Sequence, residues 1–350
     1  MTGHFRKAAG AALIGMIVAT GARTSAAETS AAETQQGEAA FYAGRNVILV
    51  IAAAAGGGYD RWGRVVGRHI GKHIPGNPSI VPQNMPAGGG IAAAGHLYAV
   101  AAKDGATFGI LTRDAPLTPV MNPALARFDP EKMNWLGSPT TETSVCISNR
   151  RAQVATWKDL FQKELIVGDT GAGTGTHVYP RALNGLFGTK FKVIAGFQNS
   201  VDVFLAMERG EVDGICESYD SINEKKPGWL RNKVFNALVQ GGAEPHPDLA
   251  GVPFVNDLAK NDKQRAALRF LYAGQGIGRP FVAPPDIPPA RLKVLREAFA
   301  ATMRDPEFLD EAHKLRFRVE PVSAEKLTAL IDELVETPRD VVDSVAQYIK

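Results

Sequence analysis

Short apolar runs that end in glycine-rich turns and continue into amphipathic segments constrain the fold of this chain most strongly. The run NVILVIAAA at residues 46–54 predicts a buried strand, and apolar side chains recur at helical spacing through residues 60–74. The same order of strand, glycine-rich turn and helix returns at residues 165–187. Such repetition is typical of α/β proteins in which helices cover a parallel sheet. The chain of 350 residues is long enough for two such lobes.

The first 27 residues have the features of a secretory signal peptide. Arg6 and Lys7 precede about 15 weakly polar to apolar residues, and Ser25 and Ala27 offer a small-residue cleavage site. This stretch is shorter than the roughly 20 residues that span a bilayer as a helix. We therefore expect cleavage near Ala27 and a periplasmic location, with an uncleaved anchor as the alternative. The sequence SAAET occurs twice in a row at residues 25–34, and residues 28–41 are predicted to form a disordered linker.

The charge balance gives no support for nucleic acid as a partner. Three of the 39 basic residues and none of the 36 acidic residues lie in the signal segment, so the mature chain has 36 of each. Binding to a phosphate backbone needs a clustered positive surface. We therefore expect no nucleic-acid partner.

The loop AAAAGGGYD at residues 52–60 is predicted to bring the backbone close to a ligand. It lacks the Lys-Ser/Thr pair of a phosphate-binding P-loop, and Arg61 stands where a dinucleotide fingerprint needs its third glycine. The N–H groups that begin the following helix carry partial positive charge, which suits a carboxylate as well as a phosphate. A tight turn without a ligand is the alternative.

The loop GDTGAGTGTH at residues 168–177 has the same design with hydroxyl groups added. Thr174 and Thr176 can donate hydrogen bonds to carboxylate oxygens, and His177 is expected at the start of the helix. Two such loops in two similar units predict a ligand held between two lobes, at the carboxyl ends of their strands. Here too, a turn without a ligand is the alternative.

The sequence contains no recognisable catalytic, metal or cofactor motif. It has neither a G-x-S-x-G elbow nor an H-E-x-x-H pair. His69 and His73 are four residues apart on a predicted helix, but no third ligand is evident, and we interpret them as part of a solvated or boundary face. Asp60 is interpreted as an acid at the start of the helix that orders the first loop or contacts the ligand through water. Cys146 and Cys216 either form a disulfide or remain buried thiols.

Five motifs, taken in order, resemble the periplasmic substrate-binding proteins of tripartite tricarboxylate transporters, also called the Bug family. They are AGGGYD, IPGNPSIVPQNMPAGGGIAAAGHLYAVAAKDG, GAGTGTH, VIAGFQNSVDVFLAMERGEVDGICES and GRPFVAPPDIPPARLKVLREAF. Each motif alone is weak, whereas their number and order are specific. The resemblance covers nearly all of the mature chain. It implies a two-lobed periplasmic binding protein fold of type II, in which crossing strands form the hinge of a clamp.

The resemblance also implies a function and a division of the chain. Family members capture small organic anions, often di- or tricarboxylates, and deliver them to membrane transporter subunits without catalysing a reaction. Lobe 1 is expected to comprise residues 42–145 and 277–350, and lobe 2 residues 146–276, in a monomer without a cofactor or metal. The alternatives are a sensor-input protein for a signalling receptor and a secreted enzyme that uses Asp60 or His177.

Carried over residue by residue, the resemblance predicts ligand contacts made by backbone N–H groups, hydroxyls and bridging waters rather than by a buried arginine. Tyr59 replaces a small residue of the family, and Thr174 replaces a serine, so Tyr59 and Asp60 are expected to set this chain's own specificity. The predicted contacts are Ala54, Gly56, Gly57, Gly58, Tyr59, Asp60, Ala87 and Gly88 in the first lobe and Gly173, Thr174, Thr176, His177, Asn199, Ser200, Tyr219 and Asp220 in the second.

Overall fold

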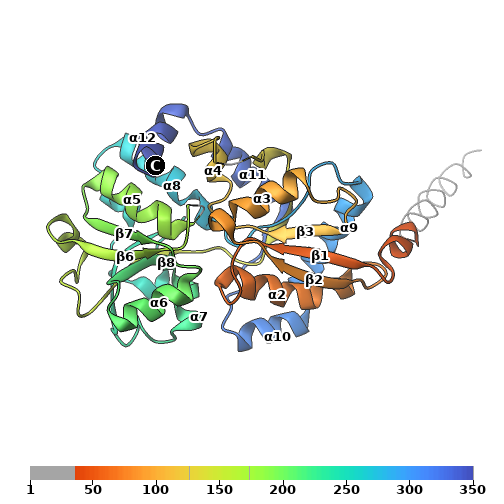
Figure 1. Ribbon diagram of the computed structural model, residues 1–350, viewed down its shortest axis with the longest axis horizontal. Helices are drawn as coiled ribbons and strands as arrows, with labels where there is room; N and C mark the ends of the chain where they lie inside the picture. Colours follow the sequence, from red (N-terminus) through yellow and green to blue (C-terminus); the bar gives the residue numbers. More distant parts are fainter. Residues whose placement is uncertain (1–35, 126, 173, 350) are drawn as a thin grey trace, which may run out of the picture.

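The computed structural model describes residues 36–125, 127–172 and 174–349 and contains two α/β sheets with helices on both faces (Figure 1). The predicted two-lobed fold is confirmed. Both sheets are mixed rather than purely parallel, because strands near the crossings between the lobes run antiparallel to their neighbours. The predicted signal peptide, and residues 28–35 of the predicted linker, lie outside the described residues.

The first sheet has six strands. Strand β1 lies next to the edge strand β2 and pairs in parallel with β2 and β3, and both of its faces are covered, as expected for a buried parallel strand. The spatial order is β11 (Val322–Ser323), β4 (Asn134–Ser138), β10 (Phe281–Ala283), β3 (Thr107–Ile110), β1 (Asn46–Ile51) and β2 (Ser79–Asn84).

The second sheet has five strands, and a disulfide joins two of them. Cys146 and Cys216 are directly paired across antiparallel neighbours and form the disulfide, which decides between the two alternatives for these residues. The spatial order is β7 (Phe191–Ala195), β6 (Leu165–Asp169), β8 (Gly214–Ser218), β5 (Ser144–Asn149) and β9 (Phe235–Gly241).

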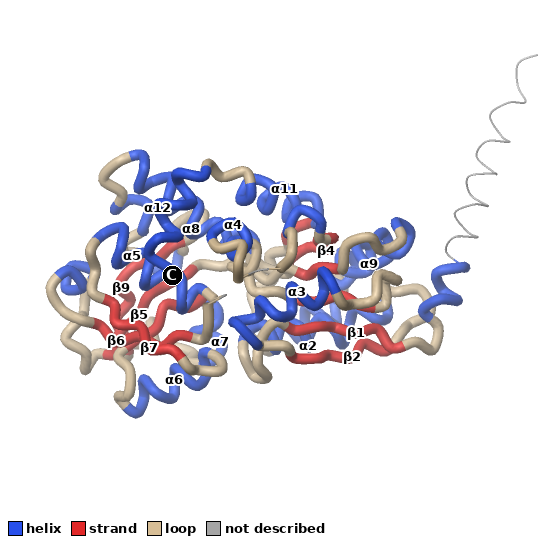
Figure 2. Tube along the Cα trace, turned by 45° about the horizontal axis from the view of Figure 1, so that its top comes forward, coloured by secondary structure: helices blue, strands red, loops and turns tan. Residues whose placement is uncertain are grey.

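Helices pack on the sheets through three apolar cores. One core lies under α2, α9 and α10 on the first sheet, and another lies under α6 and α7 on the second. The largest core runs through both lobes under α3, α4, α5, α8, α11 and α12, which Figure 2 shows along one side of the molecule. The helices are α2 (Gly58–Ile70), α3 (Ile91–Ala99), α4 (Leu117–Met121), α5 (Gly175–Phe187), α6 (Ser200–Arg209), α7 (Tyr219–Lys225), α8 (Asp262–Ile277), α9 (Pro289–Thr302), α10 (Pro306–Lys314), α11 (Ala324–Val335) and α12 (Arg339–Ile349).

Two short segments carry the chain between the sheets. Residues 139–143 lead from β4 to β5, and residues 278–280 lead from α8 back to β10. Hydrogen bonds tie the two crossings together: the backbone N–H of Arg279 donates to Ser138 Oγ at 2.8 Å, and that of Glu142 donates to the Gln275 carbonyl at 2.9 Å. The hinge is therefore a pair of coupled strands rather than two independent linkers.

Two local features depart from the sequence-based expectations. Residues 36–42 are helical, so the predicted disordered linker to residue 41 is wrong over its last six residues. Tyr42 is buried there, with its hydroxyl bonded to the Gly105 carbonyl, and Glu38 pairs with Arg291. Helix α12 packs against α5 and α8 rather than against the first sheet. The lobe boundaries stay a prediction, and this packing favours placing α12 with lobe 2.

The hinge requires glycine at position 278. Its φ is +67°, and a Cβ there would lie 1.8 Å from the Thr140 carbonyl oxygen of the other crossing. We expect Gly278→Ala to lower the free energy of unfolding by about 2–4 kcal/mol, from backbone strain and overpacking. Gly276→Ala is the matched control, because a Cβ there would meet only Leu330 at 3.7 Å. Urea denaturation of both variants checks this, and equal stabilities would contradict it.

Candidate functional site

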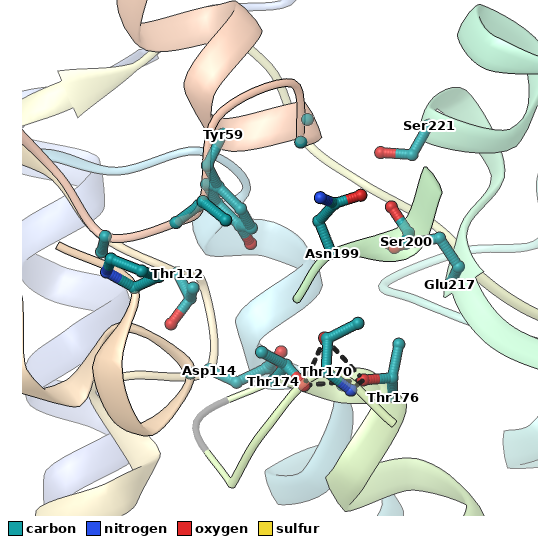
Figure 3. A pocket seen from close by; sticks show the side chains of 18 of the residues that line it. Tyr59, Thr112, Asp114, Thr170, Thr174, Thr176, Asn199, Ser200, Glu217 and Ser221 are labelled. Carbon is teal, nitrogen blue, oxygen red and sulfur yellow. Dashed lines mark hydrogen bonds between the residues drawn. The ribbon is translucent and has the colours of Figure 1, made fainter. Parts of the chain in front are cut away.

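A small cavity of about 60 Å³ lies between the two sheets (Figure 3). The segments that line it follow the carboxyl ends of β1, β2, β3, β6, β7 and β8. This is the location expected for a ligand in open α/β sheets. Both lobes therefore contribute residues to the lining of one cavity, as the pair of glycine-rich loops predicts.

Three helices begin at this cavity. Residues at the first turns of α2, α5 and α6 line it, and the first two of these helices have no side-chain hydrogen bond from their N-cap residues, Gly57 and Thr174. Asn199, in contrast, caps its own helix by accepting from the N–H groups of Val201 and Asp202. The N-terminal N–H groups of α2 and α5 are thus suited to an anion.

The threonines of the second loop form a hydroxyl network. Thr176 Oγ1 accepts from the Thr170 N–H at 3.0 Å, and Thr174 Oγ1 donates to the Gly171 carbonyl at 2.8 Å. Figure 3 shows the three threonine hydroxyls bonded to one another on one wall of the cavity. These bonds fix the loop, so the donors at the start of α5 are held in place before a ligand arrives.

Two buried arginines also line the cavity, and neither is among the contacts predicted from the sequence. Arg113 follows β3 and is 3% exposed, and Arg279 lies in the second crossing and is 1% exposed. The expectation that binding avoids a buried arginine is therefore at odds with this cavity. The available signal was a charged residue beside an apolar strand, after the strand in LTRDAP and before it in GIGRPF.

Arg279 contacts a carboxylate, a hydroxyl and an aromatic ring. Its Nε donates to Glu142 at 2.5 Å, its Nη2 donates to Ser221 at 2.7 Å, and its guanidinium lies 4.5 Å from the centre of the Tyr59 ring. Burial alone would lower the pKa of Arg279, but the Glu142 carboxylate raises it above the ordinary value. The same contact holds the pKa of Glu142 low against the effect of burial. This pair is ionised and structural.

Arg113, in contrast, has unused donors. Its backbone N–H and Nη1 reach the Tyr59 hydroxyl at 3.0 and 3.3 Å. Its distances to carboxylate oxygens of Asp114, Glu142 and Glu217 are 3.8–3.9 Å, too long for hydrogen bonds. Within the described part of the chain, its Nε has no hydrogen-bond partner. A buried guanidinium in this condition is prepared to accept an anion.

Eight of the sixteen predicted contacts line the cavity. Ala54, Gly57, Gly58, Tyr59, Thr174, Thr176, Asn199 and Ser200 line the cavity. Gly56, Asp60, His177, Tyr219 and Asp220 do not line it, and Ala87 and Gly88 line an adjacent hollow that shares Pro86, Gly89, Thr170 and Gln198 with the cavity. Gly173 lies outside the described residues. A binding role for each residue remains a prediction.

Asp60 and His177 form hydrogen bonds next to the two loops without lining the cavity. Asp60 is buried and accepts from the Gly56 N–H at 2.8 Å and from Arg64 and Asn84, which agrees with its interpretation as a loop-ordering acid. His177 pairs with Asp169 at 2.8 Å. Because neither residue lines the cavity, neither is placed to act on a ligand there.

Tyr219 and Asp220 lie at the start of α7 and line a separate polar groove. The Tyr219 hydroxyl donates to Asp248 at 3.0 Å, and Asp220 lies 3.6 Å from Arg318. Neither residue lines the cavity, because α7 is oriented so that Ser221 faces the cavity instead.

Helix α7 also carries a contact between the lobes. Glu224 is buried and accepts from Arg61 of α2 at 3.2 Å. Burial raises the pKa of Glu224 to about 7, outweighing the opposite effect of Arg279 and Arg61. The distance between Arg61 and Glu224 alone would suggest a permanent ion pair. Because the effect of burial on the pKa of Glu224 is larger than that of the two arginines, the contact titrates near neutral pH.

The fold is similar to those of periplasmic binding proteins. The structure of BugD superposes with a TM-score of 0.69 at 16% identity, covering 87% of this chain and 98% of BugD. MatC (Rpa3494) from Rhodopseudomonas palustris with bound malate superposes with a TM-score of 0.67 at 19% identity, covering 85% of this chain and 99% of MatC. R. palustris Rpa4515 with adipate superposes with a TM-score of 0.65 at 16% identity, covering 86% of this chain and 97% of Rpa4515. No protein-family model and no curated protein matches the sequence. These likenesses establish the fold.

The raised pKa of Glu224 predicts a pH-dependent stability. The unfolded chain ionises this group near pH 4.3, whereas the folded protein keeps its proton to about pH 7. The folded state therefore binds more protons in this range, and stability falls as the pH rises from about 5 to 8. Glu224→Gln should reduce that fall by on the order of 2 kcal/mol. Urea denaturation at both ends of the range measures it, and an unchanged fall would refute the assignment.

Proposed function

We propose that this protein is an exported solute-binding protein that captures a small organic carboxylate between its lobes and delivers it to a tripartite tricarboxylate-type transporter. The observation that carries the proposal is the convergence of the α2 and α5 N-termini with Arg113 on one cavity. Each is an anion-binding element, and they come from both lobes. A carboxylate bound there would connect the two lobes directly.

The similar structures support this reading. MatC is described with bound malate and Rpa4515 with adipate, both of which are dicarboxylates. BugD is described as a periplasmic binding protein, and we propose that this chain likewise binds a solute and catalyses no reaction. In this proposal the ligand is bound by hydrogen-bond donors of the protein itself, without a cofactor or metal.

The site between the lobes suggests how delivery follows from binding. A ligand that contacts both lobes favours the closed arrangement, so the composite surface that the lobes present changes with occupancy. A transporter subunit that recognises this surface would receive only loaded protein. We propose a periplasmic monomer for this role. No helix in the described ranges is both long and apolar enough to cross a membrane.

A ligand screen tests the proposal. The mature protein is heated in the presence of a panel of mono-, di- and tricarboxylates, and we expect at least one to raise the melting temperature. At 100 times the dissociation constant the stabilisation should be about 2.7 kcal/mol. If no organic anion shifts the transition, and native mass spectrometry finds none bound, the proposed function is wrong.

The role of Arg113 gives a sharper test. Arg113→Gln should weaken binding of the best carboxylate about 10- to 100-fold, because hydrogen bonds to charged groups contribute about 1.5–3 kcal/mol. Arg269→Gln, on the exposed side of α8, is the matched control and should bind as the wild type does. Isothermal titration measures both, with circular dichroism to verify folding. Unchanged affinity in a folded Arg113 variant would remove the guanidinium from the site.

A further inference from the structure

Two carboxylates share the cavity wall with the arginines. Asp114 is 2% exposed and follows Arg113 directly, and Glu217 is the last residue but one of β8, with 15% of its side chain exposed. Figure 3 shows them on different sides of the cavity, Asp114 near Thr174 and Glu217 near Ser200. A site built only for anions would not place acids on its wall, since like charges oppose binding.

The balance of charge around the cavity is unfavourable for a ligand with several negative charges. Arg279 is neutralised by Glu142 at 2.5 Å. Arg113 then remains as the available cation, facing both Asp114 and Glu217 at 3.9 Å. One ligand carboxylate satisfies Arg113, but a second would meet acidic groups. A protonated amine would offset them instead.

Neighbouring cations do not change this balance. Lys225 lies behind Ser200, whose hydroxyl accepts from its Nζ at 2.8 Å, and Arg61 bonds to Glu224. Neither basic residue lines the cavity. The acids also do not fully occupy Arg113, because the contacts at 3.8–3.9 Å leave its Nε without a hydrogen bond among the described residues. The two acids are therefore not explained as counter-charges for Arg113.

We infer that the cavity takes an amphoteric ligand, with a carboxylate bound by Arg113 and the α5 N-terminus and a protonated amine between Asp114 and Glu217. This inference rests on the proposed function and narrows its ligand class to amino acids in the broad chemical sense. It predicts discrimination against di- and tricarboxylates of the same length. Asp114 and Glu217 are the residues that set this specificity.

Matched ligand pairs test the inference by isothermal titration with the mature protein. The pairs are alanine with lactate, and 4-aminobutyrate with glutarate, in which only the amine is exchanged for a hydroxyl or a carboxylate. We expect the amino member of at least one pair to bind ten or more times more tightly. Glu217→Gln and Asp114→Asn should each reduce that ratio at least threefold. Glu211→Gln, an exposed acid before β8, is the control and should keep the ratio.

The outcomes separate the inference from the proposed function. If the amino member binds ten times more tightly in neither pair, the inference is overturned while carboxylate binding stands. If folded Glu217→Gln and Asp114→Asn both keep the wild-type ratio, the acids do not recognise the amine, and the inference also falls. If no carboxylate of any kind binds, the proposed function itself is lost.

Discussion

The buried pair between Arg279 and Glu142 connects every part of this molecule that the function needs. Each residue belongs to one of the two crossings between the lobes. From this point Arg279 reaches Ser221 in lobe 2 and lies against the Tyr59 ring at the start of α2. Removing one partner would leave a buried charge without compensation, which is strongly destabilising. The hinge, the first loop and the cavity wall therefore depend on one interaction.

Tyr59 connects this buried pair to Arg113. Its ring contacts Arg279, and its hydroxyl accepts from the backbone and side chain of Arg113. The large residue that departs from the family pattern thus holds the two arginines apart and in place. One of them is structural, and the other retains free donors. This division of roles explains how a cavity with several charged groups can still present a specific one to a ligand.

Local patterns predicted the fold and the loops well, because strands, helix starts and glycine turns depend on nearby residues. The segments around Gly57 and Thr174 lie at the cavity, and Asp60 orders its loop. The arginines were not predicted because their partners are distant in sequence: Arg279 and Glu142 are 137 positions apart. Likewise, spacing alone could not show that α7 turns Asp220 away from the cavity.

The central claim is that Arg113 holds a ligand carboxylate between the lobes. A crystal structure of the mature protein with its tightest-binding acid tests this most directly. We predict a carboxylate within about 3 Å of the Arg113 guanidinium and of the N–H groups that begin α5. A ligand bound elsewhere, or one in the cavity whose carboxylate makes no contact with Arg113, would contradict the account.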